Sequence, residues 1–392
     1  MSKINVRSFS NENEDGAPDL VGITTFSATS FFVPTRGSTA QRPSDHVEVG
    51  SLRYNTDTKN LEYYRGNTIG WSQFELIDPD LGGGTGSNTG LGTRGVFALG
   101  GHPSTTNKID FVTVSTLGDA QDFGDLSATS KSQSVASSRT RGIFKLGSSG
   151  DGPSESNVYE FITFSSTGYR SDFGDSTVTA RQFGGMSDST RGVFAGGYKE
   201  PGPSPYFTDR IEYITMASEG DAQDFGNLSA VQGARVPSSA SSSTRGVYHI
   251  HRPNSNILET VQISTTGNAT NYGDLTVAVD CATACANSTR GLFAGGAVAG
   301  DTSKEDIGFI TIATLGDATD FGDLLAARTR FVGATCSPTR GIFAGGNAPS
   351  TDNVMQYVEI ASTGNSKDFG DLTAVSSFGS SGGTSSNGHG GL

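Results

Sequence analysis

The side chains best suited to metal chemistry are two histidines and three cysteines. His249 and His251 alternate along the chain, so they would share one face of a β-strand, where two imidazoles can bind one metal ion. Cys281, Cys285 and Cys336 could supply thiolate ligands. Neither group has a further ligand close to it in the sequence, although a structural zinc site needs four. We therefore expect no metal and no cofactor, and interpret the cysteines as small buried residues on inner strands.

Acid–base chemistry would need carboxylates, which recur in the motif Asp-Phe-Gly-Asp. A glycosidase uses one unique pair of carboxylates, whereas this motif returns along the chain. No glycine-rich stretch leads into Gly-Lys-Ser or Gly-Lys-Thr, so the phosphate-binding loop of that type is absent from the sequence. The sequence thus predicts a protein that is not an enzyme.

The dominant feature is an internal repeat. Variants of residues 339–346 (TRGIFAGG) occur six times, at intervals of 45–54 residues, with their arginine at Arg94, Arg141, Arg191, Arg245, Arg290 and Arg340. Asp-Phe-Gly keeps the same interval, with its aromatic residue at Phe123, Phe173, Phe225, Tyr272, Phe321 and Phe369. A period near 50 residues indicates a repeat architecture.

Each repeat contains four segments that are typical of strands. The first is short and small, as in residues 333–337, and the third is apolar on both faces, as in residues 211–216. A strand that is apolar on both faces must lie between neighbouring sheets. Four strands in each of six repeats predict an all-β fold, a six-bladed β-propeller over residues 93–392.

This pattern resembles the kelch repeat, with its double glycine and its closing aromatic residue. It departs from kelch where phenylalanine, once tyrosine, replaces the usual tryptophan, and where the fourth repeat lacks the double glycine. The resemblance implies the fold and carries no particular function.

The repeated residues are expected to support the fold. The recurring phenylalanine should be buried between blades, rather than stack on a ligand. We expect the recurring arginine and the aspartate before phenylalanine to be paired within each blade; a ring of six arginines around an anion is the alternative. Residues 375–382 align with an inner strand, so the C-terminal segment should complete the first blade and leave no open edge.

The loops that vary between repeats lie on one face of such a propeller. Variable loops on a rigid scaffold suit recognition, while drift on an unconstrained surface is the alternative. The residues that we select as candidate ligand or receptor contacts are Tyr198, Tyr206, Phe207, His249, His251 and Arg252.

Residues 1–80 form a separate part. Strands are expected within residues 20–26 and 30–33, and a hairpin joins residues 52–54 to 61–63, followed by a third strand at Trp71. Residues 39–43 (TAQRP), 50–58 (GSLRYNTDT) and 61–64 (LEYY), with Trp71, resemble a module of tailed-bacteriophage structural proteins, especially tail fibres and decoration proteins. Residues 81–92 are glycine-rich and predict a flexible linker.

The composition limits the classes of partner that the protein is expected to bind. The formal net charge is −13, which argues against nucleic acid, and no run of apolar residues is long enough for a membrane span. The first residues lack the apolar core of a signal peptide, so we expect synthesis and assembly in the cytoplasm of a host cell.

The resemblance implies a non-enzymatic virion protein, attached to other virion proteins through residues 1–80. Its propeller would recognise a host-surface glycan or protein, or decorate the capsid; the sequence leaves tail and capsid open. Proteins of this kind are often trimeric, so a homo-trimer is one expectation. The alternatives are a propeller enzyme acting on surface glycans and a general kelch-type interaction scaffold.

Overall fold

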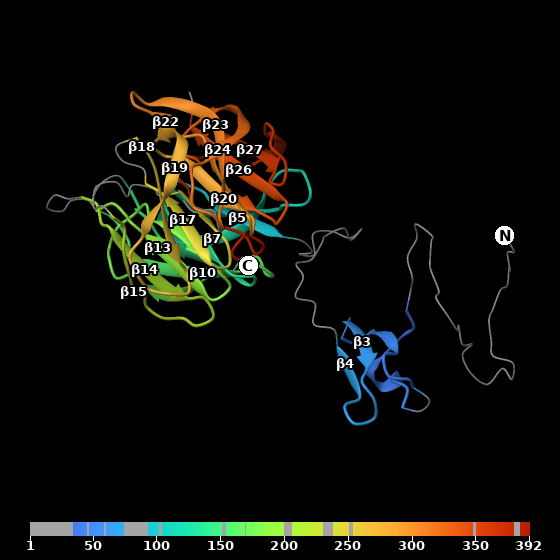
Figure 1. Cartoon of the computed structure of the whole chain (residues 1–392). Helices are drawn as coiled ribbons and strands as arrows, with labels where there is room; N and C mark the ends of the chain where they lie inside the picture. Colours follow the sequence, from blue (N-terminus) through green and yellow to red (C-terminus); the bar gives the residue numbers. More distant parts are fainter. Residues whose placement is uncertain are drawn as a thin grey trace, which may run out of the picture. The chain divides into compact units, whose positions relative to one another are not determined.

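The computed structural model describes residues 34–44, 47–58, 60–73, 93–101, 104–150, 154–168, 170–199, 206–229, 238–250, 254–347, 350–379 and 385–392. The chain divides into two units, Met1–Asp78 and Pro79–Leu392 (Figure 1). The strands expected within residues 20–33 and the linker at 81–92 lie outside the described residues.

Unit 1 contains one four-stranded sheet in the order β1-β2-β3-β4. Its elements are β1 (Arg36–Gly37), a single 3-10 turn η1 (Thr39–Gln41), β2 (Leu52–Asn55), β3 (Asn60–Tyr64) and β4 (Trp71–Gln73). Strands β2 and β3 are antiparallel, with Leu52 opposite Tyr63 and Tyr54 opposite Leu61. The predicted hairpin and the third strand at Trp71 are therefore confirmed.

The described residues of unit 2 form six antiparallel sheets, one for each repeat. Sheet 1 consists of β5 (Arg94–Ala98), β6 (Thr106–Thr113) and β7 (Gln121–Ser130). Sheet 2 consists of β8 (Ser134–Ser137), β9 (Arg141–Lys145), β10 (Val158–Thr163) and β11 (Arg170–Asp175). Sheet 3 consists of β12 (Gly184–Ser187), β13 (Arg191–Ala195), β14 (Arg210–Thr215) and β15 (Gln223–Asn227).

The remaining sheets follow the same order. Sheet 4 consists of β16 (Ser238–Ser241), β17 (Arg245–His249), β18 (Ser255–Gln262) and β19 (Thr270–Val279). Sheet 5 consists of β20 (Thr283–Ala286), β21 (Arg290–Ala294), β22 (Ala297–Val298), β23 (Thr302–Thr311) and β24 (Thr319–Arg328). Sheet 6 consists of β25 (Gly333–Cys336), β26 (Arg340–Asn347), β27 (Thr351–Glu359) and β28 (Lys367–Asp371).

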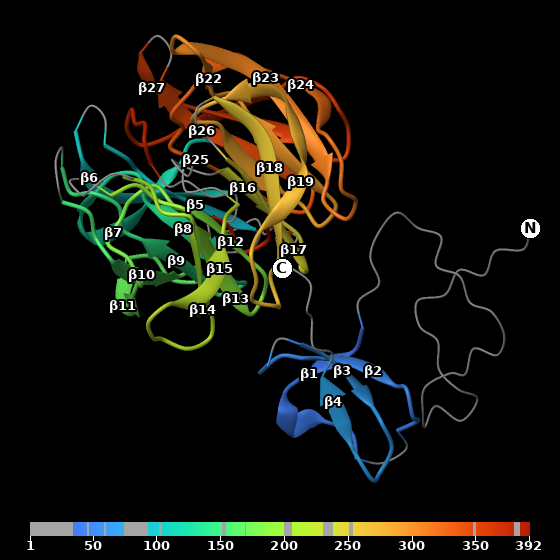
Figure 2. The same cartoon turned by 60° about the vertical axis from the view of Figure 1, so that its left-hand side comes forward.

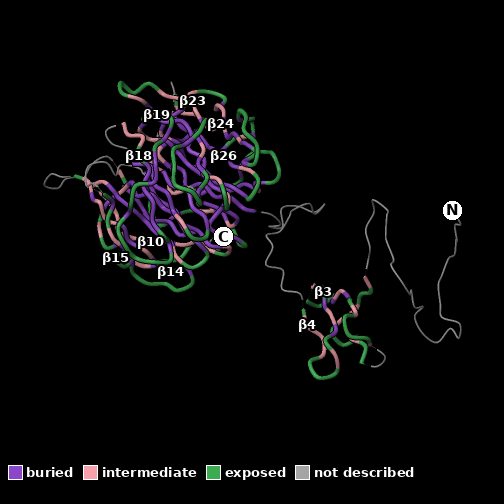
Figure 3. Tube along the Cα trace, in the orientation of Figure 1, coloured by how far each residue is buried: buried purple, intermediate pink, exposed green. Residues whose placement is uncertain are grey.

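The short first strands meet in the interior of unit 2. β8 contacts β12, β12 contacts β16, β16 contacts β20, β20 contacts β25, and β25 contacts β5 of sheet 1. In Figure 2 the labels of β8, β12, β16 and β25 gather in the middle of this unit. Their small side chains, such as those of Ser187 and Ala286, allow this close approach. Figure 3 shows buried residues throughout this interior and exposed residues along its margin.

The recurring aromatic residues fill the spaces between sheets, as predicted. All six are buried, with exposed fractions of 2–3%. Phe123 of sheet 1 packs with Phe144 of sheet 2, and Phe369 of sheet 6 packs with Phe97 of sheet 1. Each such ring contributes about 1.5–3 kcal/mol through transfer from water.

One backbone hydrogen bond repeats between neighbouring sheets. The turn glycine before each fourth strand donates its N–H to the carbonyl of the buried aromatic residue in the preceding sheet, as Gly364 does to Phe321 at 2.7 Å. Gly118 of sheet 1 donates in the same way to Phe369 of sheet 6, at 2.9 Å. The glycine after each aromatic residue has a positive φ, +144° at Gly370, where a Cβ would lie 2.4 Å from Gly118 O. Both conditions require glycine at this position.

The recurring arginine joins neighbouring sheets, and Arg340 also pairs with Glu359 of its own sheet at 3.0 Å. Arg290 donates to the carbonyls of Ile360 and Ala361 in the next sheet, each at 3.0 Å, and its guanidinium lies over Phe309 of its own sheet. The expected pairing with the aspartate before phenylalanine within each repeat is therefore wrong. The reason is reach: the guanidinium extends to the carbonyls that end the neighbouring third strand. A ring of six arginines around an anion, the alternative, would need guanidinium N–H groups that these arginines already donate to carbonyls of the next sheet.

The C-terminal segment pairs with β5, as expected, but through Ser385–Asn387 rather than residues 375–382. Val96 N donates to Ser385 O at 2.8 Å, and Asn387 N donates to Arg94 O at 3.3 Å. The assignment of residues 375–382 to this strand is wrong for the part described: Phe378 N donates to Arg330 O, and Phe378 O accepts from Ser132 N. Residues 380–384 lie outside the described structure.

Candidate functional site

Three of the six candidate contact residues lie together between β13 and β14. Tyr198 lies 5.3 Å from Phe207 and 6.3 Å from Tyr206, measured between ring centroids. Tyr198 and Phe207 face each other in an antiparallel bridge, and Lys199 N donates to Tyr206 O at 2.7 Å. Backbone bonds therefore hold the three rings together; we call them the aromatic cluster. Residues 200–205 of the same loop lie outside the described structure.

A buried ion pair supports the aromatic cluster. The guanidinium of Arg181 lies 5.0 Å from the centre of the Tyr198 ring, and its Nη1 lies 3.8 Å from Glu155 Oε1. Both charged side chains are almost covered, at 12% and 5% exposed. Glu155 comes from the loop before β10 of sheet 2, so the cluster bridges two repeats. The sequence prediction missed this pair because neither position belongs to a repeated motif.

The cluster offers an amphipathic surface of mutually tilted rings. Tyr206 is 45% exposed, while Tyr198 and Phe207 are partly buried. Aromatic faces with a cation beneath them and hydroxyls at their edges suit the C–H faces and hydroxyls of a sugar, or a side chain of a protein. No reacting group is needed for such binding.

The other three candidate residues do not add to this surface. His249 is fully buried, which excludes it as a surface contact; its Nε2 bonds to Ser255 O at 2.7 Å, and burial lowers the pKa of its imidazole to about 4. His249 is the last residue of β17 and packs inward against Phe293. His251 and Arg252 lie outside the described residues.

A second buried titratable group occupies the same register position in sheet 2. Lys145 and His249 replace the alanine found at Ala98, Ala195, Ala294 and Ala344. The Lys145 ammonium donates to Leu146 O at 3.3 Å, Ser156 O at 2.8 Å and Ala180 O, and lies over the Phe183 ring. Burial lowers its pKa to about 7. The departure from alanine was the sequence signal for this residue.

The cysteines are structural. Cys285 and Cys336 are buried on the inner strands β20 and β25, and Cys336 Sγ donates to Ala286 O at 3.0 Å. Cys281 differs from the prediction: it precedes β20, is partly exposed and has a φ of +56°. Among the described residues, no three His, Cys, Asp or Glu side chains are grouped as a metal site would require.

Unit 1 presents an unusual surface: the apolar side of its sheet faces outward. Leu52 and Leu61 are 51% and 38% exposed, and their cross-strand partners Tyr63 and Tyr54 are partly exposed. We call these four residues the apolar face. The alternate positions of β2 and β3 are the buried ones: polar Arg53, Asn55 and Glu62, and also Tyr64, whose ring packs against Trp71 in a small core.

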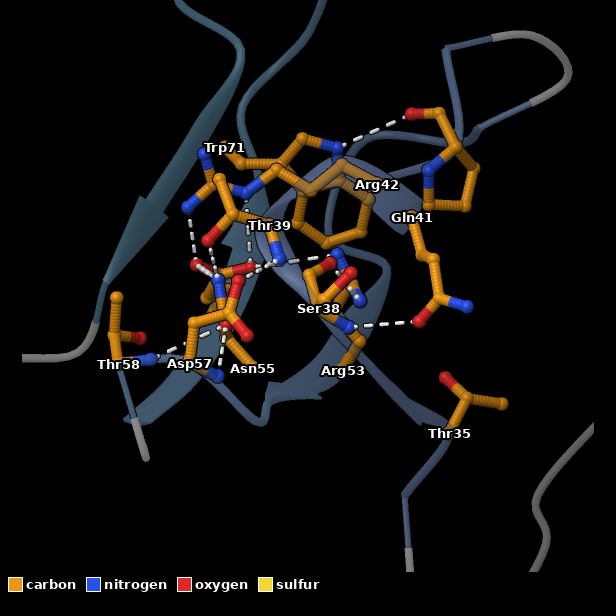
Figure 4. A network of polar contacts seen from close by, with 12 residues as sticks. Thr35, Ser38, Thr39, Gln41, Arg42, Arg53, Asn55, Asp57, Thr58 and Trp71 are labelled. Carbon is orange, nitrogen blue, oxygen red and sulfur yellow. Dashed lines mark hydrogen bonds and ion pairs between the residues drawn. The ribbon is translucent and has the colours of Figure 1, made fainter.

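The buried side of the same sheet holds a charged network (Figure 4). Glu62 is fully buried; it accepts from Asn55 Nδ2 at 2.7 Å and from Arg42, and lies 3.7 Å from Arg53 Nη1. The hydrogen bond from Arg42 lowers the pKa of the Glu62 carboxyl. The ring of Trp71 covers the network, with Nε1 donating to Pro43 O at 3.2 Å.

No described protein family matches the sequence, and no curated protein is significantly similar to it. In the described part of the chain, no helix has the length and apolarity to cross a bilayer.

Proposed function

We propose that the six sheets of unit 2 are the blades of a β-propeller. Support comes from contacts that recur from each sheet to the next and also join sheet 6 to sheet 1. Arg340 of sheet 6 donates to Val114 O of sheet 1 at 3.1 Å, as Arg290 does one sheet earlier. The hydrogen bond from Gly118 to Phe369 likewise joins sheet 1 to sheet 6, as the equivalent glycine joins each other pair of neighbouring sheets. A radial arrangement of six sheets gives every sheet two such neighbours.

On this basis, we propose a non-enzymatic structural protein of a tailed-phage virion, with unit 1 attached to the particle. One observation carries the proposal: the residues that resemble the phage module are those that build the buried network of unit 1. Glu62, Arg53 and Asn55 occupy the inner side of β2 and β3, which leaves Leu52 and Leu61 outward. An apolar sheet face of this kind suits a protein partner, here another virion protein.

Attachment predicts a specific loss. Replacing Leu61 with Glu (Leu61→Glu) should strongly reduce the copies of the protein on purified particles, because a carboxylate in an apolar interface costs several kcal/mol unless paired. The measurement is quantitative immunoblotting of gradient-purified virions, combined with antibody labelling in electron microscopy to locate the chain on tail or capsid.

Ile69→Glu is the matched control. Ile69 is 56% exposed but lies in the turn between β3 and β4, not on the two strands that carry the apolar face. Normal incorporation of Leu61→Glu, or absence of the wild-type chain from particles, would contradict the attachment proposal.

We further propose that unit 2 recognises a host-surface glycan or protein through the aromatic cluster. Tyr206→Ala should weaken binding of the purified full chain to host cells about tenfold, since an exposed aromatic anchor typically supplies 1–2 kcal/mol. Tyr206→Phe, which keeps the ring, should retain most of the binding. Flow cytometry with fluorescent protein measures both; equal binding by Tyr206→Ala and wild type would show that this surface is not the contact.

A further inference from the structure

Described residues of sheets 5 and 6 line a solvent-open cavity of about 520 Å³. Its walls come from the β22–β23 hairpin, the end of β24, the segment that follows it, and the end of β26. The lining residues are Asp301, Ser303, Ala326, Ala327, Thr329, Arg330 and Asn347. A cavity of this volume lies within the usual range for small-ligand sites.

The backbone around the cavity is fixed. Thr329 and Asn347 exchange two hydrogen bonds, Thr329 N to Asn347 O at 3.1 Å and Asn347 N to Thr329 O at 2.8 Å. Arg328 is ion-paired with Asp352, which anchors the segment from its other side. On the opposite wall, Val298 pairs with Thr302 in the hairpin that carries Asp301. The backbone that carries the lining residues is therefore held in place before any ligand arrives.

One polar atom in the wall has no partner among the described residues. Thr329 is only 4% exposed, yet its Oγ1 makes no hydrogen bond. A buried hydroxyl without a partner destabilises the fold, so its retention needs a reason. The Oγ1 atom has almost no solvent-accessible surface, so a ligand hydroxyl in the cavity that Thr329 lines would supply the missing bond once the threonine side chain turns toward it.

The charged groups point to a neutral ligand. Arg330 Nη2 lies 3.6 Å from Asp301 Oδ1, and the Asp301 side chain is 84% exposed. A pair this exposed adds little to stability. It does place a planar donor and a planar acceptor side by side, and Asp301 together with the net charge of −13 disfavours anions at Arg330.

The repeats show that this combination is specific to one site. Arg330 has a φ of +54°, and the corresponding left-handed residues in other sheets are Ser132, Gln182, Cys281 and Phe378. Arg330 alone among these described positions is cationic. The backbone shape is thus general to the fold, whereas the cation and the unpartnered threonine are not.

We propose that this cavity binds a neutral saccharide of one or two rings. Thr329, Ser303 and Asn347 are suited to its hydroxyls, the Arg330–Asp301 pair to two adjacent hydroxyls, and the Ala326 and Ala327 methyls to its C–H face. The site is separate from the aromatic cluster. Its proposed ligand is a glycan, as in the proposed function, but the inference does not depend on the chain being part of a virion.

The test is titration of the purified full chain with glucose, galactose, rhamnose, N-acetylglucosamine and lactose, followed by calorimetry and ligand-observed NMR. At least one sugar should bind with a millimolar or lower Kd. Thr329→Val should weaken that binding about tenfold without lowering the melting temperature, since the methyl replaces a hydroxyl with no protein partner. Arg330→Asn, which tolerates a positive φ, should weaken it further.

Tyr206→Ala is the control, and it should bind the sugar as the wild type does. Binding to none of the sugars at millimolar concentration, tighter binding of inorganic phosphate, or unchanged binding by Thr329→Val would each overturn the proposal. Those results leave the virion proposal intact when particles still carry the chain. Conversely, sugar binding by a chain absent from particles would support the cavity alone.

Discussion

Deleting residues 385–392 is expected to lower the melting temperature of unit 2 by about 8 °C. The segment supplies the strand that β5 otherwise lacks: Val96 N, Arg94 N and Arg94 O all bond to it. The Ser385 and Ser386 hydroxyls donate to Ala334 and Cys336 carbonyls of sheet 6. At about 1 kcal/mol per hydrogen bond, the segment contributes on the order of 5 kcal/mol, which corresponds to that shift in a unit of this size.

The last residues reach further than β5. His389 Nε2 lies 2.9 Å from Ser137 O of sheet 2 and 3.2 Å from Ser187 Oγ of sheet 3, and Gly390 N donates to Ala286 O of sheet 5 at 2.8 Å. A Cβ on Gly391 would lie 1.8 Å from Ser187 O. The C-terminal residues thus contact several sheets at once, and Gly391→Ala alone should reproduce much of the loss.

Differential scanning calorimetry of the full chain measures the shift. A chain without residues 2–33 is the control, because it loses more residues, all from unit 1, and its unit 2 transition should not move. If the chain without residues 385–392 melts like the wild type, the contacts of the C-terminal segment contribute nothing to the cooperative unit.

The register error in this segment has a physical cause. An inner strand needs small side chains, and both Ser376–Ser377 and Ser385–Ser386 satisfy that need. The two serine pairs differ in their contacts, since Ser385 and Ser386 bond to Ala334 and Cys336. A pattern of residue types in the sequence does not reveal such contacts. By contrast, Phe123 and its equivalents were predicted as buried because their spacing and their glycine neighbour repeat six times.

The candidate site shows the same limit. Tyr198, Tyr206 and Phe207 could be grouped from the sequence because one loop carries them. Arg181 and Glu155 could not, because their pairing depends on how two sheets pack. In unit 1 the alternation of Leu61 with Glu62 gave the two faces of the strand, but not which face is buried. The arginine partners of Glu62 decide that: Arg53 lies opposite it on β2, and Arg42 comes from the segment before that strand.

Acidification from pH 7 to pH 5 is expected to lower the free energy of unfolding of unit 2 by about 3–4 kcal/mol. Burial lowers the pKa of both His249 and His389 from 6.5 to about 4. Their folded pKa values are below the unfolded value, so the unfolded chain takes up protons first as the pH falls. Stability is therefore full above pH 6.5 and declines until about pH 4, with each histidine contributing roughly half.

Two other buried groups of unit 2 also change stability with pH. Lys145, with its pKa lowered to about 7, changes stability mostly between pH 7 and pH 10, again in the direction of greater stability at high pH. Burial raises the pKa of Asp110, which opposes the histidines, because the folded state then binds that proton more readily. The charged groups that act on His389 are Arg139, which lowers its pKa, and Asp188, which raises it.

Urea denaturation of the full chain, followed at several pH values, measures the dependence. His389→Gln and His249→Gln each replace the imidazole with a neutral amide that can still donate to Ser137 O or Ser255 O, so each variant should halve the loss between pH 7 and pH 5. The double variant should be nearly independent of pH there. The prediction fails if the wild-type unit is equally stable at both pH values, or if each single variant loses as much stability as the wild type. Protons would then reach these imidazoles without unfolding of the unit. The buried positions of β17 and of the C-terminal segment would then open in the native state.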